Sequence, residues 1–92
     1  MSTGNMPFVS AHPLTASANV RNTSGGMLGI FVSAASATPT ITVYDDAGMG
    51  TASKLVDTFT PVAGTWYPLP FAFGSGLYVV LSGTVSCTVG LI

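Results

Sequence analysis

Glycine and proline recur every several residues along this chain, and this spacing limits the length of regular elements more than any other feature. The sequence holds 11 glycines and 6 prolines among 92 residues. Glycine favours turns through its backbone freedom, and proline lacks the amide donor that a helix interior needs. The runs between them are rich in valine, isoleucine, threonine and aromatic residues, which favour extended structure. The sequence therefore predicts many short strands and no long helix.

Alternation of apolar and polar residues indicates which side chains these strands bury. It is clearest in residues 27–34 and 40–44. In the first strand it places Leu28, Ile30 and Val32 on one face and Gly29, Phe31 and Ser33 on the other, and in the second it buries Ile41 and Val43.

The carboxyl-terminal part of the chain predicts a β-hairpin. Residues 77–81 and 84–92 are strand-like runs that flank Ser82 and Gly83, a pair suited to a tight turn. The second run repeats apolar residues with period two on one face: Val85, Cys87, Val89 and Leu91.

A weak strand is predicted over residues 17–23, and further strands over residues 54–60 and 65–67. Pro68 and Pro70 make the next segment an edge strand or a bulged crossing. About six to eight strands, with turns about every eight to twelve residues, are typical of small all-β domains. The expected fold class is all-β, a small antiparallel β-sandwich or jelly-roll-like barrel.

The expected domain organisation is an extended arm over residues 1–15 followed by a single domain over residues 16–92. The arm carries Pro7 and Pro13 among scattered apolar residues, which suits a segment that docks elsewhere. Its start lacks the basic and apolar regions of a secretion signal, so synthesis in the cytoplasm of the producing cell is expected. The longest apolar runs are far shorter than the ~20 residues of a membrane-spanning helix.

Charge is scarce. Five residues are charged, namely Arg21, Asp45, Asp46, Lys54 and Asp57. Ordinary soluble domains carry charge on about a quarter of their residues. Such a chain is expected to be covered by neighbours in an assembly of like subunits, or else to be a monomer kept soluble by neutral polar residues. Two basic side chains cannot neutralise a phosphate track, which argues against nucleic-acid binding.

The residues that could perform chemistry are too few for an enzyme. One histidine, His12, one cysteine, Cys87, and three aspartates give no nucleophile, base and orienting acid at any known spacing. Cys87 has no partner residues for a metal and is expected to be a small buried hydrophobe. Asp45 and Asp46 could join a calcium site, but their spacing matches no calcium loop, and turn hydrogen bonds are the expected role. We therefore expect no catalytic residue, no cofactor and no metal.

Aromatic residues are the best candidates for a binding surface. Trp66 and Tyr67 are adjacent in a predicted strand, so they point to opposite faces and one of them meets solvent or a partner. A protein contact and a stacking platform for sugars are both compatible with such a surface. The residues predicted to contact protein neighbours are Met6, Phe8, Trp66, Tyr67, Phe71 and Phe73.

Arg21 is a further candidate contact. Its guanidinium could bind a carboxylate of a neighbouring subunit, and a plain solvated arginine is the alternative.

Three segments resemble the small all-β virion proteins of tailed bacteriophages. They are a strand that ends in Tyr-Asp (residues 40–45), a Gly-Thr-Trp-Tyr-Pro turn (64–68), and Gly-Leu-Tyr-Val followed by Ser-Gly-Thr-Val (76–85). The resemblance covers roughly residue 20 to the carboxyl end and brings no catalytic residues.

The resemblance implies a capsid decoration or cement protein that binds the outer surface of the phage head. Its partners would be the major capsid protein, whose capsomers it would bridge, and further copies of itself, with a trimer favoured. The alternative is a carbohydrate- or receptor-binding module of a tail fibre or baseplate. The virion is the expected location in either case.

Overall fold

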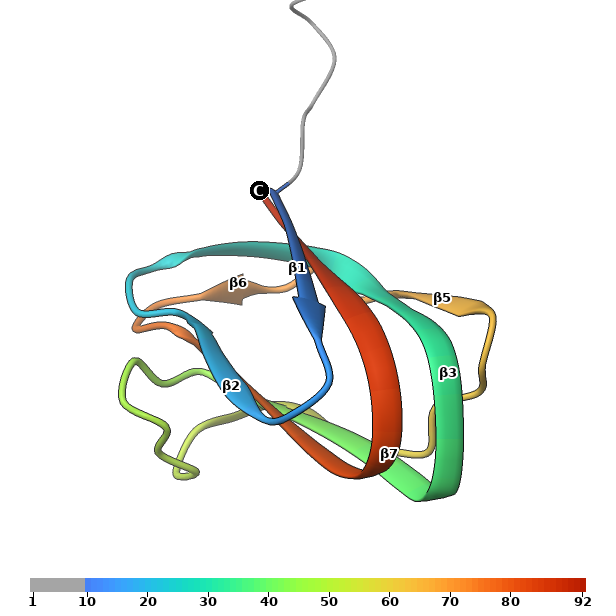
Figure 1. The fold of residues 1–92 in the computed structure, drawn as a ribbon. Helices are drawn as coiled ribbons and strands as arrows, with labels where there is room; N and C mark the ends of the chain where they lie inside the picture. Colours follow the sequence, from blue (N-terminus) through green and yellow to red (C-terminus); the bar gives the residue numbers. More distant parts are fainter. Residues whose placement is uncertain (1–9) are drawn as a thin grey trace, which may run out of the picture.

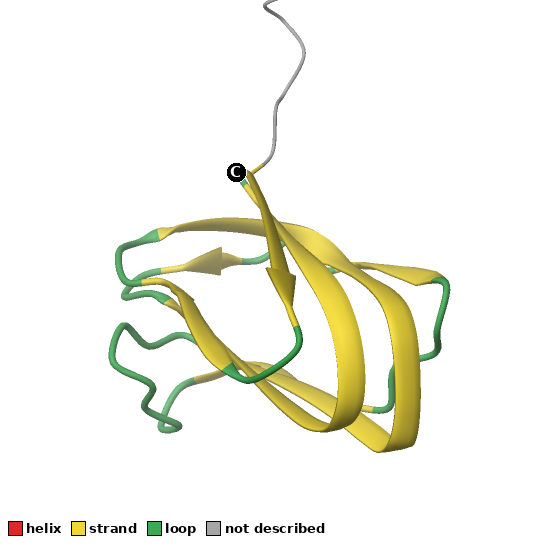
Figure 2. Ribbon diagram, in the orientation of Figure 1, coloured by secondary structure: helices red, strands yellow, loops and turns green. Residues whose placement is uncertain are grey.

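The computed structural model describes residues 10–92, which form an all-β domain without a helix (Figures 1 and 2). The strands pair antiparallel in the order β1-β7-β3-β4, while β2 pairs with β7, and β5 and β6 pair with β3. Their bounds are β1 Ser10–Leu14, β2 Ala18–Arg21, β3 Gly25–Tyr44, β4 Lys54–Phe59, β5 Thr65–Pro68, β6 Ala72–Phe73 and β7 Leu77–Leu91. The predicted all-β antiparallel class is confirmed. Within residues 10–92 no helix could span a membrane.

Two long strands form the frame of the domain. β3 has 20 residues and β7 has 15, and they pair from Met27 opposite Leu91 to Tyr44 opposite Tyr78. Each strand is continuous through one sharp bend, after which the two-stranded ribbon doubles back (Figure 1). The first half-sheet comprises β1, β5 and residues 27–36 and 84–91 of the ribbon. The second half-sheet comprises β2, β4 and the remainder of the ribbon.

The backbone at the bend explains how both strands turn together. Ala37 and Thr38 of β3 have φ of 59° and 53°, and Gly83 of β7 has φ of 76°. A β-carbon on Gly83 would lie 2.6 Å from the carbonyl oxygen of Ala37, so only glycine fits there.

A single core lies between the two half-sheets. Both ends of the ribbon contribute, and the most deeply buried side chains include Met27, Ile30, Val32, Ile41, Val43, Leu77, Val79, Val89 and Leu91. The predicted burial of Ile41 and Val43 is confirmed. Cys87 is 2% exposed, which confirms its predicted role as a buried hydrophobe, and burial raises the pKa of its thiol.

The predicted hairpin at Ser82 and Gly83 is wrong. Gly83 does adopt a left-handed conformation, but it bends β7 without reversing it. Residues on both sides of Gly83 pair with β3 instead of with one another. The partner strand therefore decides whether a turn-like sequence becomes a hairpin or a bend.

The predicted placement of Leu28 on the same face as Ile30 and Val32 is also wrong. The register between β3 and β7 shifts between Met27 and Gly29, as in a β-bulge. Met27 is therefore buried, and Leu28 is 38% exposed.

The last part of the predicted arm belongs to the sheet. Strand β1 pairs with β7 from Ser10 opposite Leu91 to Leu14 opposite Cys87. Pro13 is tolerated because β1 is an edge strand, where a missing amide donor can face away from the ladder. Met6 and Phe8 lie outside the described residues.

Candidate functional site

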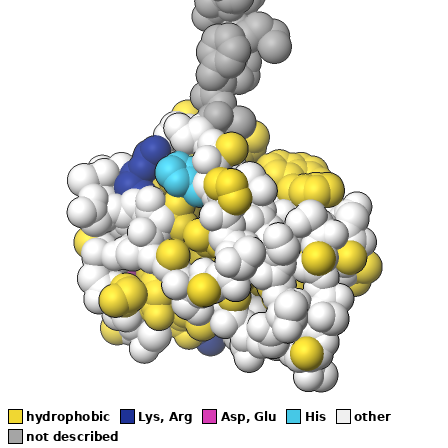
Figure 3. All heavy atoms as spheres, viewed as in Figure 1, with side chains coloured by type: hydrophobic (Ala, Val, Ile, Leu, Met, Phe, Trp, Pro, Cys, Tyr) yellow, Lys and Arg dark blue, Asp and Glu magenta, His cyan; other side chains and the backbone are white. Residues whose placement is uncertain are grey.

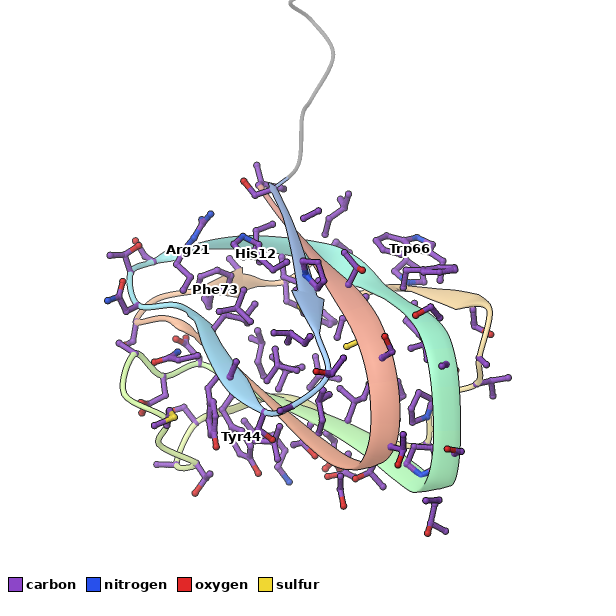
Figure 4. All side chains as sticks on the ribbon, viewed as in Figure 1. His12, Arg21, Tyr44, Trp66 and Phe73 are labelled. Carbon is purple, nitrogen blue, oxygen red and sulfur yellow. The ribbon has the colours of Figure 1, made fainter. Side chains whose placement is uncertain are left out.

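The outer face of the first half-sheet carries three exposed apolar side chains. Leu28, Phe31 and Trp66 are 38%, 41% and 44% exposed. Phe31 and Trp66 lie opposite each other on β3 and β5, so their side chains emerge side by side. In Figure 4 the indole of Trp66 points outward, away from the core.

Two glycines form a backbone platform beneath the indole. A β-carbon on Gly29 would lie 2.7 Å from the Trp66 ring and would also meet the carbonyl oxygen of Tyr67. A β-carbon on Gly90 would lie 3.9 Å from the ring and 3.8 Å from Leu28. Glycine within a strand marks such a close approach. These two positions are the signal by which the sequence could have located the platform.

The rest of this face consists of small and neutral residues. By alternation with the buried residues of β7 and β1, the outward residues there include Ser86, Thr88, Gly90, Ala11 and Pro13. We call this surface, together with Leu28, Phe31 and Trp66, the neutral face. In Figure 3 apolar atoms gather over β3 and β5, with no basic or acidic atoms beside them.

Tyr67 occupies the opposite side of β5 from Trp66. Its ring packs against the core and lies 4.9 Å from that of Phe59, centroid to centroid. Its hydroxyl accepts a hydrogen bond of 2.8 Å from the amide of Val62. One of the adjacent residues Trp66 and Tyr67 was expected to point outward, and Trp66 does so. Tyr67 packs inward and contributes to the fold.

Phe71 and Phe73 also differ in position. Phe71 is 43% exposed, whereas Phe73 is 3% exposed and belongs to the core. Phe73 therefore offers no surface to a partner in the folded domain, and we remove it from the candidate contacts.

Arg21 lies at a second exposed surface, close to the end of the chain. Its guanidinium donates a hydrogen bond of 3.1 Å to the carbonyl oxygen of Ile92. The Ile92 side chain is 68% exposed and lies against Gly26, next to the point where the amide of Met27 bonds the carbonyl oxygen of Phe71. We call Arg21, Phe71 and Ile92 the terminal surface. Within residues 10–92, Arg21 forms no ion pair with an aspartate.

Asp45 and Asp46 bind backbone amides of their own chain. The Asp45 carboxylate accepts hydrogen bonds from Gly74 and Ser75, both at 2.8 Å, and from Gly76 at 3.3 Å. Asp46 accepts bonds from Gly48 at 2.7 Å and Gly50 at 2.9 Å. These bonds hold the pKa of both carboxyls below the ordinary value of 3.8. The predicted turn role is confirmed for Asp46, whose bond to Gly48 spans two residues.

The bonds made by Asp45 were not predicted, because they join segments about thirty residues apart. Asn19 ties the same region together, since its amide donates to the carbonyl oxygens of Arg21, Asp46 and Leu77 at 3.0 to 3.1 Å. We call residues 45–50 and 74–76 with Asn19 the acid loop region. A single asparagine in a weak strand gives no sequence signal of this role.

The remaining polar candidates are His12, Lys54 and Asp57. His12 is half-buried on β1, and residues 10–92 hold no cluster of three potential metal ligands and no pocket. Lys54 and Asp57 form an exposed ion pair of 3.0 Å, which raises the pKa of the lysine and lowers that of the aspartate.

Searches of protein families, of curated proteins and of solved structures give no match to this chain.

Proposed function

We propose that this chain is a non-enzymatic capsid decoration or cement protein of a tailed bacteriophage, and that its domain is a small jelly-roll-like β-sandwich. The observation that carries the proposal is the neutral face. A domain with five charged residues exposes Leu28, Phe31 and Trp66 on a face that bears none of them. Exposed apolar patches of this kind mark contact surfaces.

Attachment to a shell would use burial of neutral surface. A standard interface removes about 800 Å² from each partner. The domain exposes 4856 Å², so contacts with sister subunits and with the shell could cover nearly half of its surface. The neutral face and the terminal surface provide two separate places for such contacts.

The partners in this proposal are the major capsid protein and further copies of the chain, for which the sequence favours a trimer. Each copy would bridge capsomers on the outer surface of the head after synthesis in the host cytoplasm. Because it binds only the assembled lattice, it shifts the equilibrium toward assembly by mass action. The proposal includes no nucleic-acid or membrane partner.

The test is to add the labelled full chain to phage heads that lack it and to image the particles. We expect density at regular sites on the outside of the head and shells that withstand more heat. Phe71→Ala should reduce occupancy, because Phe71 is an exposed part of the terminal surface. Met49→Ala, at a side chain 61% exposed in the acid loop region, is the matched control. Bare heads with wild-type protein, or label on tails alone, would reject the proposal.

The second candidate function is carbohydrate or receptor binding on a tail fibre or baseplate. The side-by-side pair of Phe31 and Trp66 favours it, because exposed aromatic rings stack on sugars. Sugar sites also need polar groups that fix hydroxyls, and the neutral face offers little beyond Ser33, Ser86 and Thr88. Binding on a glycan array that disappears in Trp66→Ala would favour this function over cementing.

A further inference from the structure

The side chains on the two sides of the neutral face project to different heights above the sheet. The bulky residues Leu28, Phe31 and Trp66 emerge from β3 and β5. Gly90 of β7 lies beneath the Trp66 ring, but the other outward residues of the neighbouring strands β7 and β1 are small and uncovered, among them Ser86, Thr88 and Ala11. The sheet order β1-β7-β3-β5 places the two sides next to each other. The face is therefore a ridge beside a shallow trough.

Such a surface is complementary to itself under one particular rotation. A two-fold axis that runs parallel to the strands, between β3 and β7, turns one copy over and exchanges its two sides. The ridge of each copy then lies over the trough of the other. We propose that the neutral face binds a second copy of this chain in this way, with Phe31 of each copy against Thr88 of the other. The two sheets would stack about 10 Å apart with nearly aligned strands, as in ordinary sheet packing.

The absence of charge makes a second copy a suitable occupant. Identical surfaces that bear charges place like charges near each other in a two-fold interface. All five charged residues lie off the neutral face, on the acid loop region, on β4 and at the terminal surface. Pairing therefore buries no charge.

The size of the face predicts a weak dimer. The strand segments of the first half-sheet cover roughly 430 Å² of sheet, at ~4.8 Å between strands and ~3.3 Å per residue. Because side chains project from the sheet, the accessible area of the face is larger than this flat area. It approaches the ~600 Å² per partner at the lower end of specific interfaces. We therefore expect a dissociation constant of about 1–100 µM.

A second copy is thus the partner of the neutral face within the proposed function. Only the role of this pairing on the phage head rests on that function. Pairing of this kind makes a dimer, in place of the trimer favoured by the sequence. Both tests below use the purified full chain alone, without heads or glycans. A failure here therefore leaves head binding through the terminal surface intact, and bare heads leave self-association intact.

The first test is sedimentation equilibrium of the full chain. We expect a monomer–dimer equilibrium that Trp66→Ala weakens by about tenfold or more and that Met49→Ala leaves unchanged. Tenfold corresponds to the loss of one well-buried contact. A wild-type chain that stays monomeric to about 1 mM overturns the inference, as does a trimer or an equal effect of the two variants.

The second test examines the geometry and does not depend on removing Trp66. Thr88→Lys and Phe31→Glu each place a charge on the neutral face and should abolish dimer formation in separate solutions. Mixing the two variants should restore a 1:1 dimer, because the proposed axis brings the introduced lysine of one copy to the introduced glutamate of the other. The control is Met49→Lys, which introduces the same lysine outside the neutral face. This variant alone in solution should still form a dimer. If mixing the two variants restores no dimer, the proposed axis is wrong.

Discussion

The neutral face and the acid loop region use their residues in opposite ways. In the acid loop region, Asp45 and Asp46 accept five backbone hydrogen bonds, and the Asn19 amide donates three more. On the neutral face, Phe31 and Trp66 remain more than 40% exposed. Hydrogen-bonding capacity is thus satisfied within the chain in one region, while apolar surface is left uncovered in the other.

This contrast indicates the structural role of the few charged residues. Two of the three aspartates close loops, and the third pairs with Lys54. Arg21 bonds the carbonyl oxygen of Ile92. Every charged side chain therefore has a partner within the described chain, and the surface left for other molecules is mainly neutral. Recognition by this domain would depend on shape and apolar contact more than on charge.

The largest expected effect comes from breaking the acid loop region. A β-carbon at position 76 would lie 2.6 to 2.8 Å from backbone atoms of Arg21, Asp46 and Ala47. Gly76→Ala should cost about 3 kcal/mol of unfolding free energy and lower the thermal midpoint by more than roughly 10 °C. Gly74→Ala is the control, because its β-carbon would meet only Asp45 Oδ2, at 3.8 Å. Equal midpoints for the two variants would contradict the packing described for this region.

Removal of the indole should produce a smaller loss of stability but a clear loss of association. The chain itself covers more than half of Trp66, so Trp66→Ala should cost about 2 kcal/mol. Urea unfolding with circular dichroism measures this cost. Gly74→Ala should change neither stability nor association. If Trp66→Ala left the dimer intact, the neutral face would have no role in pairing.

Acid should weaken the acid loop region but not the contact on the neutral face. The pKa values of Asp45 and Asp46 lie below 3.8 in the folded chain, so their contribution to stability is present above that pH. It is lost as the pH falls below 3.8 through the lowered folded pKa values. Urea midpoints measured between pH 7 and pH 2 should fall less steeply for Asp45→Asn than for the wild type. An unchanged slope would show that the bonds to residues 74–76 contribute little.

The smallest effect is expected from salt. Association through a neutral face buries no charge, so an increase in sodium chloride from about 50 mM to about 500 mM should change the dimer dissociation constant by less than about twofold. Sedimentation at the two concentrations measures the change. A tenfold weakening would point to an ionic contact, for which Arg21 is the first candidate.

The sequence predicted the local pattern of this domain better than its long-range arrangement. Period-two alternation placed Ile41 and Val43 in the core and required one of Trp66 and Tyr67 to point outward, because alternation depends only on neighbouring residues. The bulge that exposes Leu28 and the bend at Gly83 depend on the pairing of β3 with β7, which is distant in sequence. Local patterns cannot specify such pairing.

The candidate site was predicted in part. Trp66 and Phe71 are exposed, as their proposed roles require, but Phe73 is buried although it lies only two residues from Phe71. The short β6 begins at Ala72, so Phe71 lies outside the regular strand and simple alternation fails there. Alternation places Phe31 on the face opposite Ile30 and Val32, but its position beside Trp66 depends on the pairing of β3 with β5, so the sequence does not mark it as a contact.

The most direct test of the neutral face uses the only tryptophan of the chain as a reporter. Trp66 fluorescence of the full chain should be measured with acrylamide quencher at increasing protein concentration, and again with added heads. We predict that quenching falls as the protein concentration rises through the micromolar range, because a second copy covers the indole. A quenching constant that stays the same at every protein concentration and with heads present would contradict the claim that this face is a protein contact.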